Sequence, residues 1–224
     1  MKKLLVFITL CFFLSSCRER IVQLPKTTNN EITEVLDVSP IYIFYNEETG
    51  ESEFNRANMI GTTNWLVNID KRLTLKLVLP HLQYLQEKRN KDSMHKNEEA
   101  RNYFTCSNPE TGSLAFIDFT EVQFKKDTLK KVSKKYSSLS EEKLTFLNVE
   151  SLNHFSIYTS SGENHIEKNI SFVVTYLEDA DLDFPVFLNF SEEISFQDYI
   201  SVKSELSNIK NQKLKISNQE FIYN

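Results

Sequence analysis

The sequence predicts an α+β fold in which mixed sheets are covered by a few helices. Short segments dense in β-branched and aromatic residues are typical of strands, and they are interspersed with longer stretches whose apolar residues recur at helical spacing. A hydrophobic content of 40%, with 17 Phe and 9 Tyr, is typical of a folded chain rather than a disordered one.

The first half of the chain begins with clear strand patterns. Strands are expected at Ile41–Tyr45, Trp65–Ile69 and Leu114–Phe119, and a short helix at Phe54–Ile60. Leu73–Arg89 fits both an alternating strand and a helical stripe, but its length and polar end favour a helix, despite Pro80. The polar stretch 90–112 predicts a long loop or insertion.

The second half is predicted to contain two helices and several short strands. One helix is expected at Lys125–Ser138, and another begins at Ser195 with Phe196 and Tyr199 on its apolar face. Strands are expected at Leu144–Val149, Phe155–Tyr158, Phe172–Leu177, Val186–Phe190, Leu214–Ile216 and Phe221–Tyr223.

One internal match suggests that the chain repeats a structural unit. Leu66–Leu75 aligns without gaps with Phe187–Phe196, so that Thr74 corresponds to Ser195. Both segments show a buried strand, a charged turn, a hydroxyl residue and an amphipathic helix. The match predicts two similar strand–strand–helix–strand halves, 39–124 and 125–224, although a chance match between two strand–helix units is the alternative.

The same plan resembles the periplasmic domain of the ExbD/TolR family of envelope energy-transduction proteins. Asn68–Leu75, with Asp70 and Lys71 at the turn, carries the resemblance over about 50 residues in each half. The resemblance implies this fold and a habit of binding envelope components. Proteins of that family carry an uncleaved transmembrane anchor with an acidic residue, which this chain lacks, so no ion-driven role is carried over.

The N-terminus has the layout of a secretory signal peptide, residues 1–16. Lys2 and Lys3 precede the apolar run Leu4–Phe13, which is too short to span a bilayer that needs about 20 residues. The residues Leu14-Ser15-Ser16-Cys17 resemble the lipobox of bacterial lipoproteins. The resemblance implies that Cys17 is fatty-acylated, for example with palmitate, and becomes the first residue of the mature chain.

The residues after Cys17 suggest where the lipoprotein resides. In the family rule, Asp after the lipidated cysteine favours the inner membrane, so Arg18 favours the outer membrane, facing the periplasm. Residues 17–38 are polar and carry no clear period, which predicts a flexible tether.

Composition excludes several partners and cofactors. Removal of residues 1–16 takes away two lysines and leaves 24 basic against 31 acidic residues, a net charge of −7, which argues against nucleic acid. Only four glycines are present, with no glycine-rich phosphate loop, and this disfavours a nucleotide cofactor. We expect no cofactor and no metal.

Residues with catalytic or metal-binding potential do not form recognisable motifs. The four histidines, His81, His95, His154 and His165, show no close metal-binding spacing. The alternating acids Asp179, Asp181 and Asp183 lack the Gly and Glu of a calcium loop, so a turn explains them better. Cys106 is the one thiol left in the mature chain and is expected to be a small buried residue.

A lysine cluster within the predicted helix at 125–138 has two interpretations. It is either a solvated face or a surface that contacts anionic headgroups or an acidic polymer, where each lysine contributes about 1 kcal/mol. The lysines are Lys125, Lys126, Lys130, Lys131, Lys134 and Lys135.

These observations favour a non-enzymatic envelope lipoprotein that binds a protein partner or a cell-wall polymer. The alternatives are a lipid-anchored hydrolase acting on cell-wall or sugar substrates, for which two distant acids would have to meet, and a nutrient-binding lipoprotein.

Overall fold

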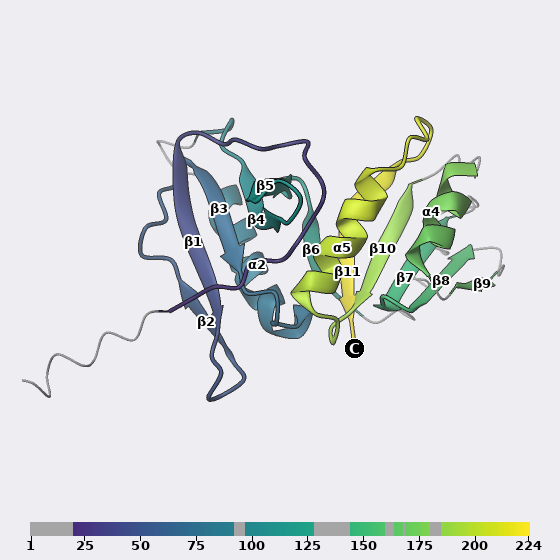
Figure 1. The fold of residues 1–224 in the computed structure, drawn as a ribbon, viewed down its shortest axis with the longest axis horizontal. Coiled ribbons are helices and arrows are strands. Elements are labelled where there is room, and N and C mark those ends of the chain that lie inside the picture. Colours follow the sequence, from purple (N-terminus) through teal and green to yellow (C-terminus); the bar gives the residue numbers. More distant parts are fainter. Residues whose placement is uncertain (1–19, 92–96, 128–143, 160–163, 168, 180–184) are drawn as a thin grey trace, which may run out of the picture.

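The computed structural model describes residues 20–91, 97–127, 144–159, 164–167, 169–179 and 185–224. Two mixed sheets lie side by side and are accompanied by the helices α2, α4 and α5 (Figure 1). The predicted α+β class is confirmed.

The first sheet has the strand order β2-β1-β3-β4-β5. Its strands are β1 (Val38–Tyr45), β2 (Ser52–Asn55), β3 (Asn64–Ile69), β4 (Asn102–Asn108) and β5 (Ser113–Asp118), and α2 (Leu75–Asn90) connects β3 to β4. The three central strands β1, β3 and β4 are parallel, whereas β2 and β5 run antiparallel at the two edges.

The second sheet has the order β6-β11-β10-β7-β8-β9. Its strands are β6 (Gln123–Lys126), β7 (Thr145–Ser151), β8 (His154–Thr159), β9 (Asn164–Glu167), β10 (Val186–Ser191) and β11 (Ile216–Tyr223). α4 (Ile170–Asp179) precedes β10, and α5 (Phe196–Ser207) connects β10 to β11.

The two sheets repeat one topology. In each half, the first strand of a hairpin (β1 or β7) pairs with a parallel strand (β3 or β10). A helix (α2 or α5) connects this strand to a further parallel strand (β4 or β11). The strand order β2-β1-β3-β4 therefore corresponds to β8-β7-β10-β11. The segments Leu66–Leu75 and Phe187–Phe196 occupy equivalent places, each leading from a central strand into its helix. Instead of the two strands expected before this helix, the first half has three, β1 to β3, and the second half has four, β7 to β10, with α4 between β9 and β10.

The equivalent helices α2 and α5 meet at their N-termini. The first N–H groups of a helix have no partner within the helix, and here each helix donates them to carbonyls of the opposite half. The bonds run from Leu75 N to Ile194 O (3.0 Å), Lys76 N to Glu192 O (2.8 Å), Phe196 N to Leu73 O (2.7 Å) and Gln197 N to Lys71 O (3.1 Å). Under the sequence alignment these four bonds form two equivalent pairs, so the halves are related by an approximate two-fold axis between Thr74 and Ser195.

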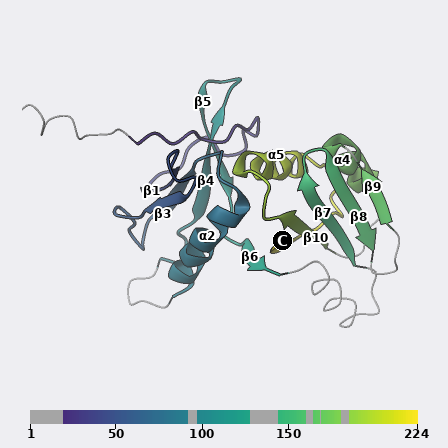
Figure 2. The same ribbon diagram turned by 90° about the horizontal axis from the view of Figure 1, so that it is seen from below.

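One hydrophobic core joins the two halves, and α5 lies between the sheets (Figure 2). The Tyr199 ring of α5 lies 5.0 Å from Phe190 of its own sheet and 6.1 Å from Phe104 of the first sheet. Phe104 also stacks on Phe119 at 3.8 Å. Aromatic contacts of this kind add to the burial energy of each ring, so the two sheets share one packed interior.

The N-terminal segment does not behave as the free tether predicted over 17–38. Its described part, residues 20–37, runs along the first sheet and then beside α5. Thr27 N donates to Ser107 O of β4 at 3.1 Å, and the Thr27 hydroxyl donates to Ser204 of α5 at 2.9 Å. The polar composition that suggested a tether instead supplies hydrogen bonds to both halves.

Three further expectations are corrected by the structure. Phe172–Leu177 lies in α4 rather than a strand, because Val173 and Leu177, four residues apart, face the core together. The stretch 90–112 contains β4. Its polar residues Asn102 and Asn108 are buried, and hydrogen bonds satisfy their side chains. Phe54–Ile60 holds the end of β2 and a turn rather than a helix.

The predicted helix at 125–138 is also wrong at its start, because Lys125 and Lys126 belong to β6. The Gln86 side chain of α2 donates to Val122 O, just before this strand, and accepts from Phe124 N within it. The two final strands expected at 214–216 and 221–223 are one strand, β11.

The two equivalent helix caps provide a matched stability test. The Ser195 hydroxyl accepts a hydrogen bond from Asp198 N, whereas Thr74 makes no such side-chain bond. Ser195→Ala should therefore lower the free energy of unfolding by about 1 kcal/mol, and Thr74→Ala by less than about 0.5 kcal/mol. Urea denaturation of both variants measures this difference, and equal losses would contradict the assigned caps.

Candidate functional site

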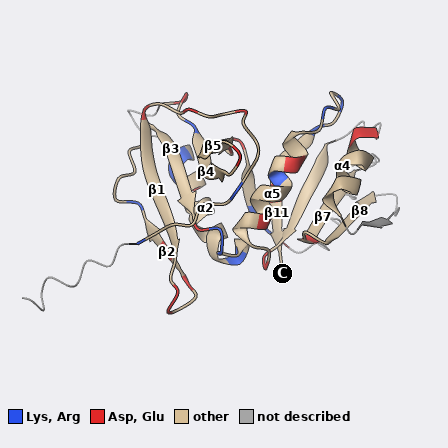
Figure 3. Cartoon of the chain, in the orientation of Figure 1, with Lys and Arg blue, Asp and Glu red and all other residues tan. Residues whose placement is uncertain are grey.

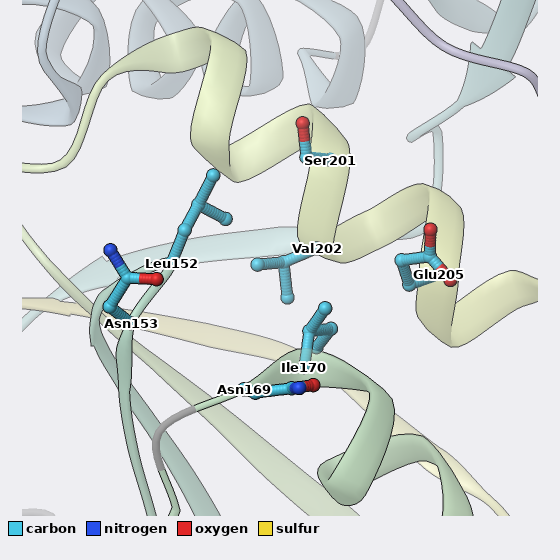
Figure 4. A pocket seen from close by; sticks show the side chains of 7 residues that line it. All are labelled: Leu152, Asn153, Asn169, Ile170, Ser201, Val202 and Glu205. Carbon is cyan, nitrogen blue, oxygen red and sulfur yellow. The ribbon is translucent and has the colours of Figure 1, made fainter.

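A hollow of about 330 Å³ lies between α5, the start of α4 and the turn between β7 and β8. Leu152, Ile170 and Val202 converge on its apolar floor (Figure 4). Val202 is fully buried, and Leu152 and Ile170 pack against the core, so the floor belongs to the rigid interior. The place of the hollow is therefore set by the packing of α4 and α5.

Polar groups surround this apolar floor: Asn153, Asn169, Ser201 and Glu205. The side-chain oxygen Oδ1 of Asn169 accepts a hydrogen bond from Ser171 N at 2.6 Å, so the side-chain NH2 group of Asn169 is left to donate. Glu205 is exposed, and among the described residues its carboxylate makes no ion pair. The rim thus offers carboxamide groups and a carboxylate to a bound group.

Ser201 has the hydrogen bonds of a structural serine. Its hydroxyl donates to Gln197 O at 3.0 Å and accepts from the Gln197 side chain at 3.1 Å. A nucleophilic serine instead gives its proton to an adjacent base. The hollow is therefore equipped to bind by shape and hydrogen bonding.

A smaller hollow of about 230 Å³ lies beside the first, between α5 and the N-terminal segment. Ser201 and Glu205 line both hollows, one turn apart on α5. Lys26 and Gln197 line the second hollow, and Lys26 N donates to the Gln197 side chain at 2.8 Å. The two hollows therefore flank one ridge of α5.

A buried polar trio distinguishes the second half from the first. Glu220 of β11 is fully buried and accepts from the Tyr199 hydroxyl at 2.8 Å and from the Lys203 ammonium group. Burial, together with the charge of Glu220, raises the pKa of Tyr199. Strand register places Glu220 where the first half has Phe104. The trio satisfies its own charges and packs α5 against the sheet, which is a structural role.

The half-buried guanidinium of Arg89, near the end of α2, forms a second polar feature. Its guanidinium lies 3.7 Å above the Trp65 ring, and it donates to Asn102 Oδ1 and to the carbonyls of Gly61 and Thr63. Burial lowers its pKa to about 10. Because its donors are already used, Arg89 holds α2 against the first sheet.

The lysines singled out from the sequence are only partly described. Lys126 pairs with Glu192 at 3.0 Å, and Lys76 reaches the same carboxylate at 3.5 Å. The Lys126 contact lowers the pKa of Glu192. Lys130, Lys131, Lys134 and Lys135 lie outside the described residues, as does Cys17. Contact of this cluster with an anionic surface remains a prediction.

The histidines do not come together in the described structure. His81 of α2 bonds the Ser52 hydroxyl at 2.8 Å, and burial lowers its pKa. His154 pairs with Glu150 at 3.2 Å, His165 lies in β9, and His95 is outside the described residues. Within the described ranges, no group of three His, Cys, Asp or Glu side chains is placed to hold a metal ion.

The alternating acids of the second half are described only at their start. Asp179 ends α4, and Asp181 and Asp183 are not described. None of the described helices is long and apolar enough to cross a membrane.

The residues of the hollow were not predicted from the sequence. They come from three separate segments, 152–153, 169–170 and 201–205, and each has an ordinary local role in a turn or helix. The one local signal is Glu205, an acid on the exposed side of an amphipathic helix. Comparison with protein-family models, curated proteins and solved structures found no match to this chain.

The buried thiol of Cys106 allows a test of how the core is packed around β4. Burial raises the pKa of Cys106 to about 12, so at pH 8 the thiolate that reacts with disulfide reagents is scarce. We expect no reaction of Cys106 with such a reagent in the native protein at pH 8 and complete reaction in denaturant. Rapid native labelling would contradict the position of Cys106 in the core.

Proposed function

We propose that this chain is a non-enzymatic cell-envelope lipoprotein that binds a protein partner or a cell-wall polymer. In this proposal Cys17 carries the lipid in the outer membrane, and the hollow beside α5 receives the partner on the periplasmic side. The observation that carries the proposal is the chemistry of the hollow, an apolar floor surrounded by carboxamides and one carboxylate.

This lining suits an amide-bearing ligand with an aliphatic side chain. Leu152, Ile170 and Val202 would bury the aliphatic part, which is favourable by about 25 cal/mol for each Å² removed from water. Asn153 and Asn169 offer donors and acceptors of the kind that pair with peptide groups. Protein segments and the peptide part of a cell-wall polymer both present this chemistry.

The resemblance to the ExbD/TolR periplasmic domain agrees with a binding role. The strand–turn–helix units that suggested it correspond to β3–α2 and β10–α5. In the second of these units, the helix itself lines the hollow. The resemblance is carried by Asn68–Leu75 in the first unit, and the hollow lies beside the equivalent helix of the second unit.

Crosslinking in intact cells tests the proposed site. A photo-crosslinking residue at Asn153, on the rim of the hollow, should capture a defined envelope component, whereas the same residue at Glu110, in the turn between β4 and β5, should not. Ile170→Asp should abolish the Asn153 crosslink by placing a charge on the apolar floor. Phe172→Asp is the matched control, because Phe172 lies on the same helix, is 54% exposed and does not line the hollow.

Two outcomes would contradict the proposal. The site would be wrong if Ile170→Asp and Phe172→Asp left the crosslink equally strong. The proposed lipid anchor would be wrong if mass spectrometry of the native protein found residues 1–16 retained and no acyl group on Cys17.

A further inference from the structure

The described chain is fixed to the first sheet from its beginning at Arg20. The Arg20 guanidinium pairs with Glu53 of β2 at 2.9 Å and lies 5.9 Å from the Phe44 ring of β1. Gln23 then bonds the end of β3, donating to Asp70 at 3.2 Å and accepting from Lys71 N at 2.8 Å. The start of the described chain therefore has a definite place on the molecule.

Only a short spacer separates this place from the proposed lipid attachment. Cys17 and Arg20 are three residues apart, and an extended chain covers at most about 3.6 Å per residue. A lipid on Cys17 would therefore bring the membrane surface to within about 11 Å of the Arg20 backbone. The domain cannot turn freely above the membrane on such a spacer.

The elements that hold Arg20 lie at one end of the molecule's long axis. β1 and β2 form that end, and α4, β8 and β9 lie at the opposite end (Figure 1). Ile21, next to Arg20, is 71% exposed, and an exposed aliphatic side chain is stabilised at a lipid interface. The tip of the β1–β2 hairpin carries Glu47, Glu48 and Glu51 (Figure 3), which anionic headgroups would repel.

We propose that the β2–β1 edge of the first sheet faces the lipid surface through Arg20 and Ile21, so that the second half projects away from the membrane. The acidic hairpin tip then points along the membrane rather than into it. The hollow beside α5 is presented to the periplasm on the distal half. This orientation rests on the proposed lipid at Cys17.

Spin labels at two exposed apolar positions test the orientation. The lipidated protein is reconstituted into phosphatidylethanolamine–phosphatidylglycerol vesicles that carry a nickel-chelating lipid, with a single added cysteine in place of Ile21 or of Phe172. Cys106 is buried and Cys17 is acylated, so each variant takes one label. We expect several-fold stronger relaxation by lipid-bound nickel at Ile21→Cys than at Phe172→Cys.

A variant with a longer spacer tests whether the short distance between Cys17 and Arg20 causes the strong relaxation at Ile21→Cys. Inserting twelve Gly and Ser residues between Glu19 and Arg20 should reduce the relaxation at Ile21→Cys to the level at Phe172→Cys. Equal relaxation at the two positions in the native spacer, or relaxation that the insertion leaves unchanged, would overturn the orientation. Mass spectrometry of the same sample distinguishes this failure from a protein without an acyl chain, which would overturn the proposed function as well.

Discussion

The structure depends on the mutual capping of two helix N-termini. The first backbone N–H groups of α2 and of α5 have no acceptor within their own helix. Each helix donates two of these N–H groups to carbonyl oxygens of the other half. Unsatisfied buried N–H groups cost free energy comparable to a lost hydrogen bond. Because the donors and acceptors lie on opposite halves, neither half completes its central helix alone, and the chain forms one folding unit from two similar parts.

The halves share this frame but differ where their helices pack. At equivalent strand positions the first half has Phe104, which packs against Phe119 and the α5 ring of Tyr199, whereas the second half has Glu220, which accepts hydrogen bonds from Tyr199 and Lys203. The N-terminal segment bonds both halves and holds them beside α5. The apolar floor of the hollow, formed by Leu152, Ile170 and Val202, packs against the core that the two halves share.

The sequence predicted the elements whose apolar periodicity is strong and missed those fixed by distant contacts. α2 was predicted from the length and polar end of its segment and α5 from its apolar face, and Ser195 as the start of α5 is confirmed by its cap. β4 was missed because its polar ends are buried through side-chain hydrogen bonds, and α4 because its β-branched residues favour a strand locally. The hollow was not foreseen, since three separate segments build it and no single segment shows a motif.

Native-state hydrogen exchange at the helix N-termini tests the mutual capping most directly. The account predicts that the amides of Leu75, Lys76, Phe196 and Gln197 exchange only with global unfolding, with the same free energy in both halves. It would be contradicted if the amides of one helix exchanged through local opening while those of the other stayed protected, since the two ends would then be independent.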